Sequence, residues 1–282
     1  MKWVVLAGAL AALTLVGALT LGARTSSSVL GSYAIAKGPD ARWRLPNTLR
    51  EVSGLAMSAD GRVFAHGDER AVILELDAGR QRATKAFAMG PRGVPGDFEG
   101  IAIADGRFWL VTSNGVLYES AEGADGAEVT VRTHDTGVGA QCEVEGLAHD
   151  PTANTLVMAC KEPRVRALRG VVAIFSWSIP RKTVVRTLRM RADLLGRAVG
   201  ASSFHPSAIE RDSTTGHWLL LAARERAVVE ITAEGSIVGG VRLPRRDHQQ
   251  PEGITIASDR SLLIADEGGG RAGTLSVYRR AR

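Results

Sequence analysis

The sequence predicts an all-β fold, a single β-propeller of five four-stranded blades preceded by an apolar N-terminal helix. Three observations support this prediction. One pattern of strands recurs five times along the 282 residues, 32 glycines divide the apolar segments into short runs, and the N-terminus is an uncharged apolar segment. Short strands at regular spacing, with turn residues between them, are typical of β-sandwiches and β-propellers.

The N-terminal segment is expected to insert into a membrane. Residues 3–23 carry no charge and lie between Lys2 and Arg24, and about 20 helical residues span a hydrocarbon core of about 30 Å. Residues 1–24 are therefore predicted to be a signal anchor or a signal peptide. The bulky Leu21, three positions before the candidate cleavage site, matches a signal-peptide site poorly and favours the uncleaved anchor. With Lys2 held in the cytoplasm, the rest of the chain is exported.

The repeated unit begins with a polar residue, followed by a small residue and an apolar one. The small residues, at positions 54, 100, 146, 208 and 253, are 46, 46, 62 and 45 residues apart. A period of about 40–50 residues with four strands per unit is typical of propellers. The longest interval holds an insertion at residues 190–204, which is predicted to form a helical turn or a lid. The five units open with Ser53-Gly54-Leu55, Glu99-Gly100-Ile101, Glu145-Gly146-Leu147, Ser207-Ala208-Ile209 and Glu252-Gly253-Ile254.

The last unit ends after its third strand, so its outer strand is expected to come from the start of the folded body. Residues 33–36 or 43–45 are the candidates, and either would close the ring and remove exposed strand edges. Residues 25–44 are therefore predicted to be a tether with a closing strand, and residues 45–282 the propeller domain. The repeats give five blades; six result if the N-terminal segment and the insertion form a degenerate blade. Fourth strands of other blades are expected at residues 128–133 and 183–188.

In a propeller the first strand of each blade lies nearest the central channel, so equivalent residues form a ring around the axis. The small residue that follows each ring residue lets the crowded inner strands approach one another. A second ring is expected at the corner after the second strand of each blade. The first ring consists of Ser53, Glu99, Glu145, Ser207 and Glu252. The second consists of Asp68-Glu69, Ser113-Asn114, Lys161-Glu162, Arg224-Glu225 and Asp266-Glu267.

If both rings open on one face, their carboxylates converge there, partly offset by Lys161 and Arg224. Like charges at close range need cations, protons or buried partners, and hard oxygen ligands suit Ca²⁺ or Mg²⁺ better than zinc. The sequence therefore predicts a divalent-cation site, with Ca²⁺ as the expected ion. A packing role, in which the glutamates cap neighbouring backbone amides, is the alternative. The candidate ligands are Glu99, Glu145, Glu252, Glu69, Glu162, Glu225 and Glu267.

Other motifs give little support to further activities. The net charge of +5 comes from interleaved acids and bases, and without a nucleic-acid-binding motif it indicates a solvated surface with no nucleic-acid partner. The glycines between 268 and 273 match a dinucleotide fingerprint in letters but precede a predicted strand. No G-x-S-x-G segment is present, and no catalytic residue is assigned. Of six scattered histidines, His66 and His205 are expected to face the channel.

The two cysteines flank a predicted hairpin. Its turn lies near residues 151–153, so the flanking strands run antiparallel and place Cys142 and Cys160 almost opposite each other. In an oxidising compartment they are predicted either to form a disulfide or to remain two buried thiols.

A set of short motifs along residues 45–280 resembles the SdiA-regulated (YjiK-like) β-propeller family. The motifs are "EVSGLAMSADGRVFAHGDE", "GDFEGIAI", "CEVEGLAHDP", "CKEP" and "QPEGITIASDRSLLIADE". The resemblance implies a bacterial envelope propeller with no firmly assigned activity, and a link of some relatives to calcium responses. The "EGI" opening is shared with the esterase-like phytase group. Ser53, Ser207 and Asn114 depart from the acidic pattern, which argues against a symmetric metal ring.

Two functions follow as hypotheses. The first is an exported binding or scaffolding propeller at the bacterial inner membrane, facing the periplasm, or released into the periplasm if the leader is cleaved. It would contact the membrane through residues 3–23 and hold Ca²⁺, a small ligand or a protein partner at the channel mouth. The second is a calcium-dependent phosphoesterase or esterase. Phosphate cleavage normally needs cationic groups beside the metal, and only Lys161 and Arg224 occupy ring positions, so binding is the preferred hypothesis.

Overall fold

The computed structural model describes residues 28–281. The predicted leader at residues 1–24 and the membrane contact at residues 3–23 lie outside the described residues. Within residues 28–281, no helix is both long and apolar enough to cross a membrane.

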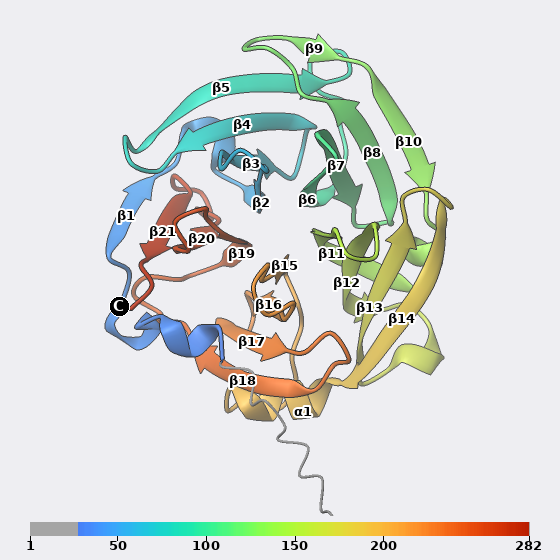
Figure 1. Cartoon of the computed structure of the whole chain (residues 1–282), viewed down its shortest axis with the longest axis vertical. Coiled ribbons are helices and arrows are strands. Elements are labelled where there is room, and N and C mark those ends of the chain that lie inside the picture. The colour runs from blue at the N-terminus through green and yellow to red at the C-terminus, as the bar shows by residue number, and fades with distance from the viewer. Residues whose placement is uncertain (1–27, 282) are drawn as a thin grey trace, which may run out of the picture.

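The described residues form five sheets arranged as a ring around a central channel, which confirms the prediction of a five-bladed propeller (Figure 1). Each sheet has an inner strand at the channel and an outer strand at the periphery. Blade one comprises β2 (Val52–Met57), β3 (Val63–Gly67), β4 (Val72–Asp77) and β5 (Arg82–Met89). Blade two comprises β6 (Phe98–Ala104), β7 (Arg107–Thr112), β8 (Val116–Ala121) and β10 (Val131–Asp135).

Blades three, four and five follow the same order from the channel outwards. Blade three comprises β11 (Cys142–Asp150), β12 (Thr155–Pro163), β13 (Val171–Ser178) and β14 (Thr183–Arg191). Blade four comprises β15 (Ala208–Arg211), β16 (Trp218–Ala222), β17 (Ala227–Ile231) and β18 (Ile237–Arg242). Blade five comprises β19 (Pro251–Ile256), β20 (Leu262–Asp266), β21 (Thr274–Tyr278) and, from the N-terminal side, β1 (Ala41–Arg44).

The ring closes through β1, which pairs antiparallel with β21 and places Trp43 opposite Leu275. The candidate closing segment at residues 43–45 was therefore nearly correct, whereas residues 33–36 contribute only an isolated bridge between Tyr33 and Arg280. Because the first and last parts of the chain share one sheet, blade five has no free outer edge at β21.

Two local expectations need correction. The strand expected at residues 128–133 is divided. β9 (Glu128–Val129) adds to blade one parallel to β5, and only β10 serves as the outer strand of blade two. The insertion forms the helix α1 (Ala192–Ala198), which confirms the helical alternative, but it lies at the periphery beside β18 and is not a lid over the channel (Figure 1). Leu195 and Phe204 bury their side chains in the core shared by blades three and four, so the insertion packs rather than acting as a lid.

The core consists of apolar side chains packed between neighbouring blades. Between blades one and two, the Phe108 ring contacts Phe64 and Phe87 edge-on, with ring centroids 4.8 and 5.2 Å apart. Between blades two and three, Trp109 and Trp177 are fully buried in the same cluster. Each such side chain contributes about 2–3 kcal/mol by leaving water, so the contacts between blades hold the ring together.

The inner strands approach so closely that larger side chains would collide at their glycines. A Cβ atom on Gly100 would lie 2.5 Å from the backbone nitrogen of Leu147 in the next blade. A Cβ atom on Gly146 would lie 2.8 Å from Cα of Ala208. These distances account for the small residue that follows each ring residue in the repeat.

Cys142 on β11 and Cys160 on β12 are joined by a disulfide. Their Cα atoms are 5.7 Å apart and both residues are buried, which is ordinary geometry for such a bridge. The disulfide ties the inner strand of blade three to its neighbour, close in sequence to Glu145 and Lys161.

Candidate functional site

The first ring is positioned by irregularities in the inner strands. On β2, Val52 pairs with Gly67 and Gly54 with His66, which leaves Ser53 unpaired in a β-bulge. Glu99 on β6 and Glu252 on β19 occupy the same kind of bulge. A bulge turns a side chain out of the regular ladder and is common next to functional sites.

Three glutamates and one lysine meet at the end of the channel where the inner strands begin. Ser53 Oγ donates a hydrogen bond of 3.0 Å to Glu99 Oε2, and this bond links blades one and two. Lys161 Nζ donates to Glu145 Oε1 within blade three. Glu145 is 3 % exposed. We call Ser53, Glu99, Glu145, Lys161 and Glu252 the acidic mouth.

Burial and mutual repulsion change the protonation of this group. Burial, followed by repulsion from Glu145 and Asp97, holds the pKa of Glu99 well above its usual range. Burial also raises the pKa of Glu145, although the charge of Lys161 opposes the rise. For Glu252, burial is again the largest cause, and repulsion from Glu99 contributes to a pKa of about 7. The three carboxyl groups therefore share one lysine and retain protons near neutral pH.

Lys161 stays charged at the centre of this group. Burial lowers its pKa, but the hydrogen bond to Glu145 and the charges of Glu145, Glu252 and Glu99 outweigh burial and raise it. One ammonium group therefore bonds to Glu145 and, through its charge, also acts on Glu99 and Glu252.

The second ring does not form one cluster. Burial, followed by repulsion from Asp68 and Glu51, raises the pKa of Glu267. Glu69 is exposed at the rim. On the other side of the channel, Glu225 accepts a 2.8 Å hydrogen bond from His205 Nδ1.

A basic residue also accompanies Glu162, since Arg224 Nη2 is 3.1 Å from its Oε1. The two ring cations, Lys161 and Arg224, are therefore both paired with glutamates. A phosphate-cleaving site would need an unpaired cation to face the phosphate group, and neither of these two residues is unpaired.

The seven candidate metal ligands are thus spread over separate groups. Within residues 28–281, no set of three or more His, Cys, Asp or Glu side chains has the geometry of a metal site. Glu99, Glu145 and Glu252 come nearest to the predicted arrangement, because they influence one another's charge. Calcium binding remains a prediction.

The two histidines that were expected at the channel have different roles. His66 is fully buried beside Gly54, with Nδ1 2.9 Å from the carbonyl oxygen of Gly67. Burial lowers its pKa to about 4, so the ring is neutral at physiological pH. His205 bonds to Glu225 at the corner of blade four and supports the second ring there.

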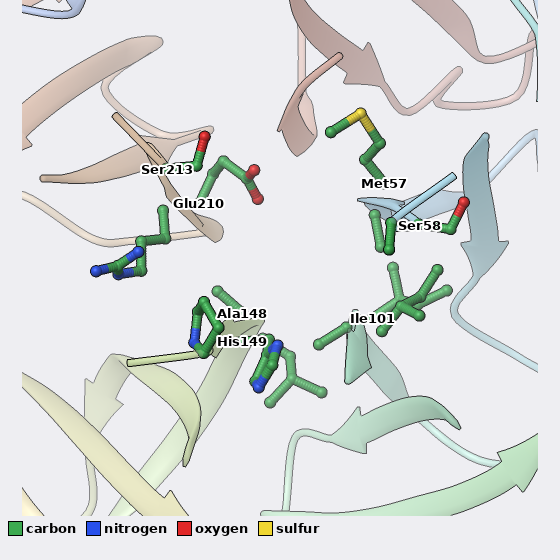
Figure 2. A pocket seen from close by; sticks show the side chains of 14 residues that line it. Met57, Ser58, Ile101, Ala148, His149, Glu210 and Ser213 are labelled. Carbon is green, nitrogen blue, oxygen red and sulfur yellow. The ribbon is translucent and has the colours of Figure 1, made fainter. Parts of the chain in front are cut away.

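A cavity at the opposite end of the channel was missed by the sequence analysis. It has a volume of about 290 Å³ and is lined by the last residues of four inner strands. Figure 2 shows Glu210, His149, Ala148, Met57 and Ile101 around it. A comparison of the five repeat units could have indicated this site. Glu210 occupies a position at which the other units have alanine or threonine.

Comparison with known protein families identifies the chain. The model of the SdiA-regulated family matches residues 124–269, which is more than half of the sequence. The chain belongs to the SdiA-regulated family. No curated protein matches this family member in sequence.

Solved structures share the propeller fold of this SdiA-regulated protein at low sequence identity. A glutaminyl cyclase of Myxococcus xanthus is 15 % identical, with a TM-score of 0.59, covering 86 % of this chain and 94 % of the cyclase. A luciferin-regenerating enzyme is 8 % identical, with a TM-score of 0.56, covering 87 % of this chain and 98 % of the enzyme. At these identities the similarity establishes the fold alone.

Proposed function

We propose that this SdiA-regulated propeller is a non-catalytic binding protein whose acidic mouth takes a cation, with Ca²⁺ as the first candidate. The observation that carries the proposal is the convergence of Glu99, Glu145 and Glu252 on the single cation Lys161. Three carboxyl groups, drawn from three different blades, share a buried space and one compensating charge. A bound cation would replace the protons that these groups otherwise retain.

The energetic argument concerns the repulsion between the carboxylates. Their pKa values are raised because burial and like charges disfavour the ionised state. A divalent cation stabilises that ionised state directly, and carboxylate oxygens are the ligands that Ca²⁺ prefers. Binding therefore requires Lys161 to leave Glu145 or to share it, and the 30 % exposure of the Lys161 side chain gives it a path towards solvent.

We further propose that the protein is exported and held at the bacterial inner membrane by residues 3–23, with the propeller in the periplasm. This part of the proposal rests on the uncharged sequence of that segment. The propeller rim would then be available to protein partners as a scaffold. Protease added to spheroplasts should degrade the propeller; a propeller that is protected until the membrane is lysed would contradict this topology.

The hydrolase alternative receives less support from the site. Lys161 and Arg224 are engaged by Glu145 and Glu162, so no unpaired ring cation is available to stabilise a transferring phosphate. A screen of phosphate and carboxylate esters with the full chain, in the presence of Ca²⁺, separates the two functions. Turnover that is lost in a Glu99→Gln variant would favour the hydrolase.

Thermal unfolding of the full chain tests cation binding. A ligand at a hundredfold excess over its Kd stabilises the folded state by about 2.7 kcal/mol, which corresponds to a rise in Tm of about 5–10 °C for a chain of this size. Millimolar Ca²⁺ should produce such a rise. The combined Glu99→Gln, Glu145→Gln and Glu252→Gln variant should lose it.

Glu234→Gln, at an exposed residue of blade four, is the matched control and should keep the full response to Ca²⁺. A wild-type Tm that Ca²⁺ and Mg²⁺ leave unchanged would favour the packing role of the glutamates. A triple variant that keeps the response would place the cation elsewhere on the protein.

A further inference from the structure

The end of the channel opposite the acidic mouth has a different chemical character. Here the inner strands of blades one to four end around the cavity of about 290 Å³. Met57, Ile101, Ala148, His149 and Glu210 reach the same open space from β2, β6, β11 and β15 (Figure 2). We call these five residues the apolar mouth. Its walls are mainly hydrocarbon, interrupted by a few polar groups, as is usual for small-molecule sites.

Glu210 is the principal polar group of the apolar mouth, and the protein satisfies it poorly. Its Oε1 atom accepts two long hydrogen bonds of 3.4 Å, from the backbone nitrogen of Ile256 and from Thr255 Oγ1. Burial is the largest cause of a pKa of about 8, and the charge of Asp212 adds to it. The carboxyl group is therefore held in an apolar environment without a cationic partner among the residues that define the mouth.

His149 supplies a second hydrogen-bonding atom that the fold does not use. Its Nε2 atom is buried and has no hydrogen-bond partner in the part of the chain that the structure describes. Burial lowers the pKa of this ring, although Asp105 and Asp150 oppose the change. The imidazole is thus neutral at physiological pH and can accept a hydrogen bond.

Arg211, the cation near the apolar mouth, does not neutralise Glu210 or bond to His149. Arg211 Nε lies 3.3 Å from Asp150 Oδ1, and its Nη2 atom donates to Thr152 Oγ1 at 3.2 Å. The guanidinium also lies over the ring of Trp218. The unmet groups of the apolar mouth are therefore a carboxyl group and a neutral imidazole, which together suit a ligand that donates hydrogen bonds and carries positive charge.

The repeat shows that Glu210 is not needed to build the blade. The equivalent residues of the other units are Ala56, Ala102, Ala148 and Thr255, which lie on the same inner strand of each blade. An ionisable group at this position is costly because most of it is buried, and the four other units fill the position with a shorter side chain. Perturbed carboxyl groups of this kind in a cavity are typical of functional sites.

We propose that the apolar mouth is a second binding site, which takes a small organic ammonium ion with an apolar body. The ammonium group would donate to Glu210 and to Nε2 of His149, while the hydrocarbon part would pack against Met57 and Ile101. The cavity lies just below the range of about 300–1,000 Å³ that drug-sized ligands occupy. The ligand is therefore a single-ring or short-chain amine, and the site is independent of the cation at the acidic mouth.

The test compares a charged and a neutral probe of similar shape. The full chain, in a non-ionic detergent, is titrated calorimetrically with 2-phenylethylamine and with 2-phenylethanol at pH 8.5, with detergent alone as the blank. The amine should bind roughly tenfold more tightly than the alcohol, a difference of about 1.4 kcal/mol, because only the amine places a charged donor against the carboxylate. Glu210→Gln should remove this preference, and Glu234→Gln, an exposed carboxylate of the same blade, should keep it.

Glu210→Ala is a second variant for the same test. Three other blades already carry alanine at this position, so the test can still be made if Glu210→Gln folds poorly. Equal affinity for both probes, unchanged amine affinity in the Glu210 variants, or no binding up to about 10 mM would overturn the proposal. An affinity that falls in Glu252→Gln instead would place the amine at the acidic mouth and also overturn it.

Discussion

The two ends of the channel differ in how they use the repeat. At the acidic mouth, three of the five units keep the same residue, and the ring structure brings Glu99, Glu145 and Glu252 together. At the apolar mouth, one unit departs from the others, and Glu210 stands alone among alanine and threonine. A site whose residues recur in several units can be predicted from the repeated pattern itself. A site that depends on one unusual residue is found only by asking where a single unit departs from that pattern.

The largest expected effect comes from breaking the geometry that forms the acidic mouth. Gly146→Ala should lower the free energy of unfolding by about 4 kcal/mol, because its Cβ would press on the backbone of Ala208 and its φ of +84° is unfavourable for alanine. Gly106→Ala is the control, since its φ is also positive but nothing lies within 4 Å, and it should cost only about 1 kcal/mol. Urea unfolding measures both, and equal losses would contradict the close approach of the inner strands.

The next effect isolates the single cation of the acidic mouth. Lys161→Met should cost about 3 kcal/mol at pH 8.5, because it leaves the buried Glu145 without its partner. The loss should shrink at pH 5, where the carboxyl groups take up protons. Arg224→Met removes an exposed ion pair with Glu162 and should cost at most about 1 kcal/mol at either pH. A pH-independent loss at Lys161 would show that its packing, rather than its charge, matters.

The pH dependence of stability distinguishes strained carboxyl groups from satisfied ones. The pKa of Glu252 is raised from 4.5 to about 7 by burial, so its contribution to stability is fully present below about pH 4.5 and is lost as the pH rises through 7. Glu252→Gln should therefore be about 2–3 kcal/mol more stable than the wild type at pH 8 and no more stable at pH 4. Chemical unfolding across this pH range measures the difference, and a variant that is less stable at pH 8 would contradict it.

The smallest expected effect is the change in the pH dependence of stability on replacing Glu210 at the apolar mouth. Burial raises the pKa of Glu210 to about 8, so its stabilising contribution is also lost with rising pH, in a higher range than for Glu252. Glu210→Ala should gain about 1–2 kcal/mol at pH 9, less than the full shift because the side chain is partly exposed in the cavity. Glu234→Gln should change little. A stability loss in Glu210→Ala at pH 9 would assign Glu210 a structural role.

Much of the fold could be predicted from the sequence because the propeller repeats. The five openings placed the inner strands, and the missing outer strand of the last unit was expected from residues 33–36 or 43–45. The second candidate ends within one residue of β1, and the first forms only an isolated bridge. The division of residues 128–133 between β9 and β10 could not be foreseen, because it depends on the packing of blade one beside blade two. Local strand propensity carries no information about which neighbouring sheet a short segment will join.

The candidate site was predicted in part for the same reason. Ser53, Glu99 and Glu252 occupy equivalent bulges at the channel, whereas Glu145 pairs with Ala159 and the irregularity of its strand falls at Gly146. The second ring separates because its members bind local partners, His205 for Glu225 and Arg224 for Glu162. His205 comes from the segment before β15, whose course the repeat does not specify, whereas Arg224 is itself a member of the second ring.

Proton release on calcium binding tests the central claim most directly. The full chain is titrated with Ca²⁺ at pH 7 in two buffers of different ionisation enthalpy, and the difference in heat gives the number of protons released. If Ca²⁺ replaces protons shared by Glu99, Glu145 and Glu252, about one or more should leave for each ion bound. The triple glutamine variant should release none. Calcium binding without proton release, or no calcium binding by the wild type, would contradict the account.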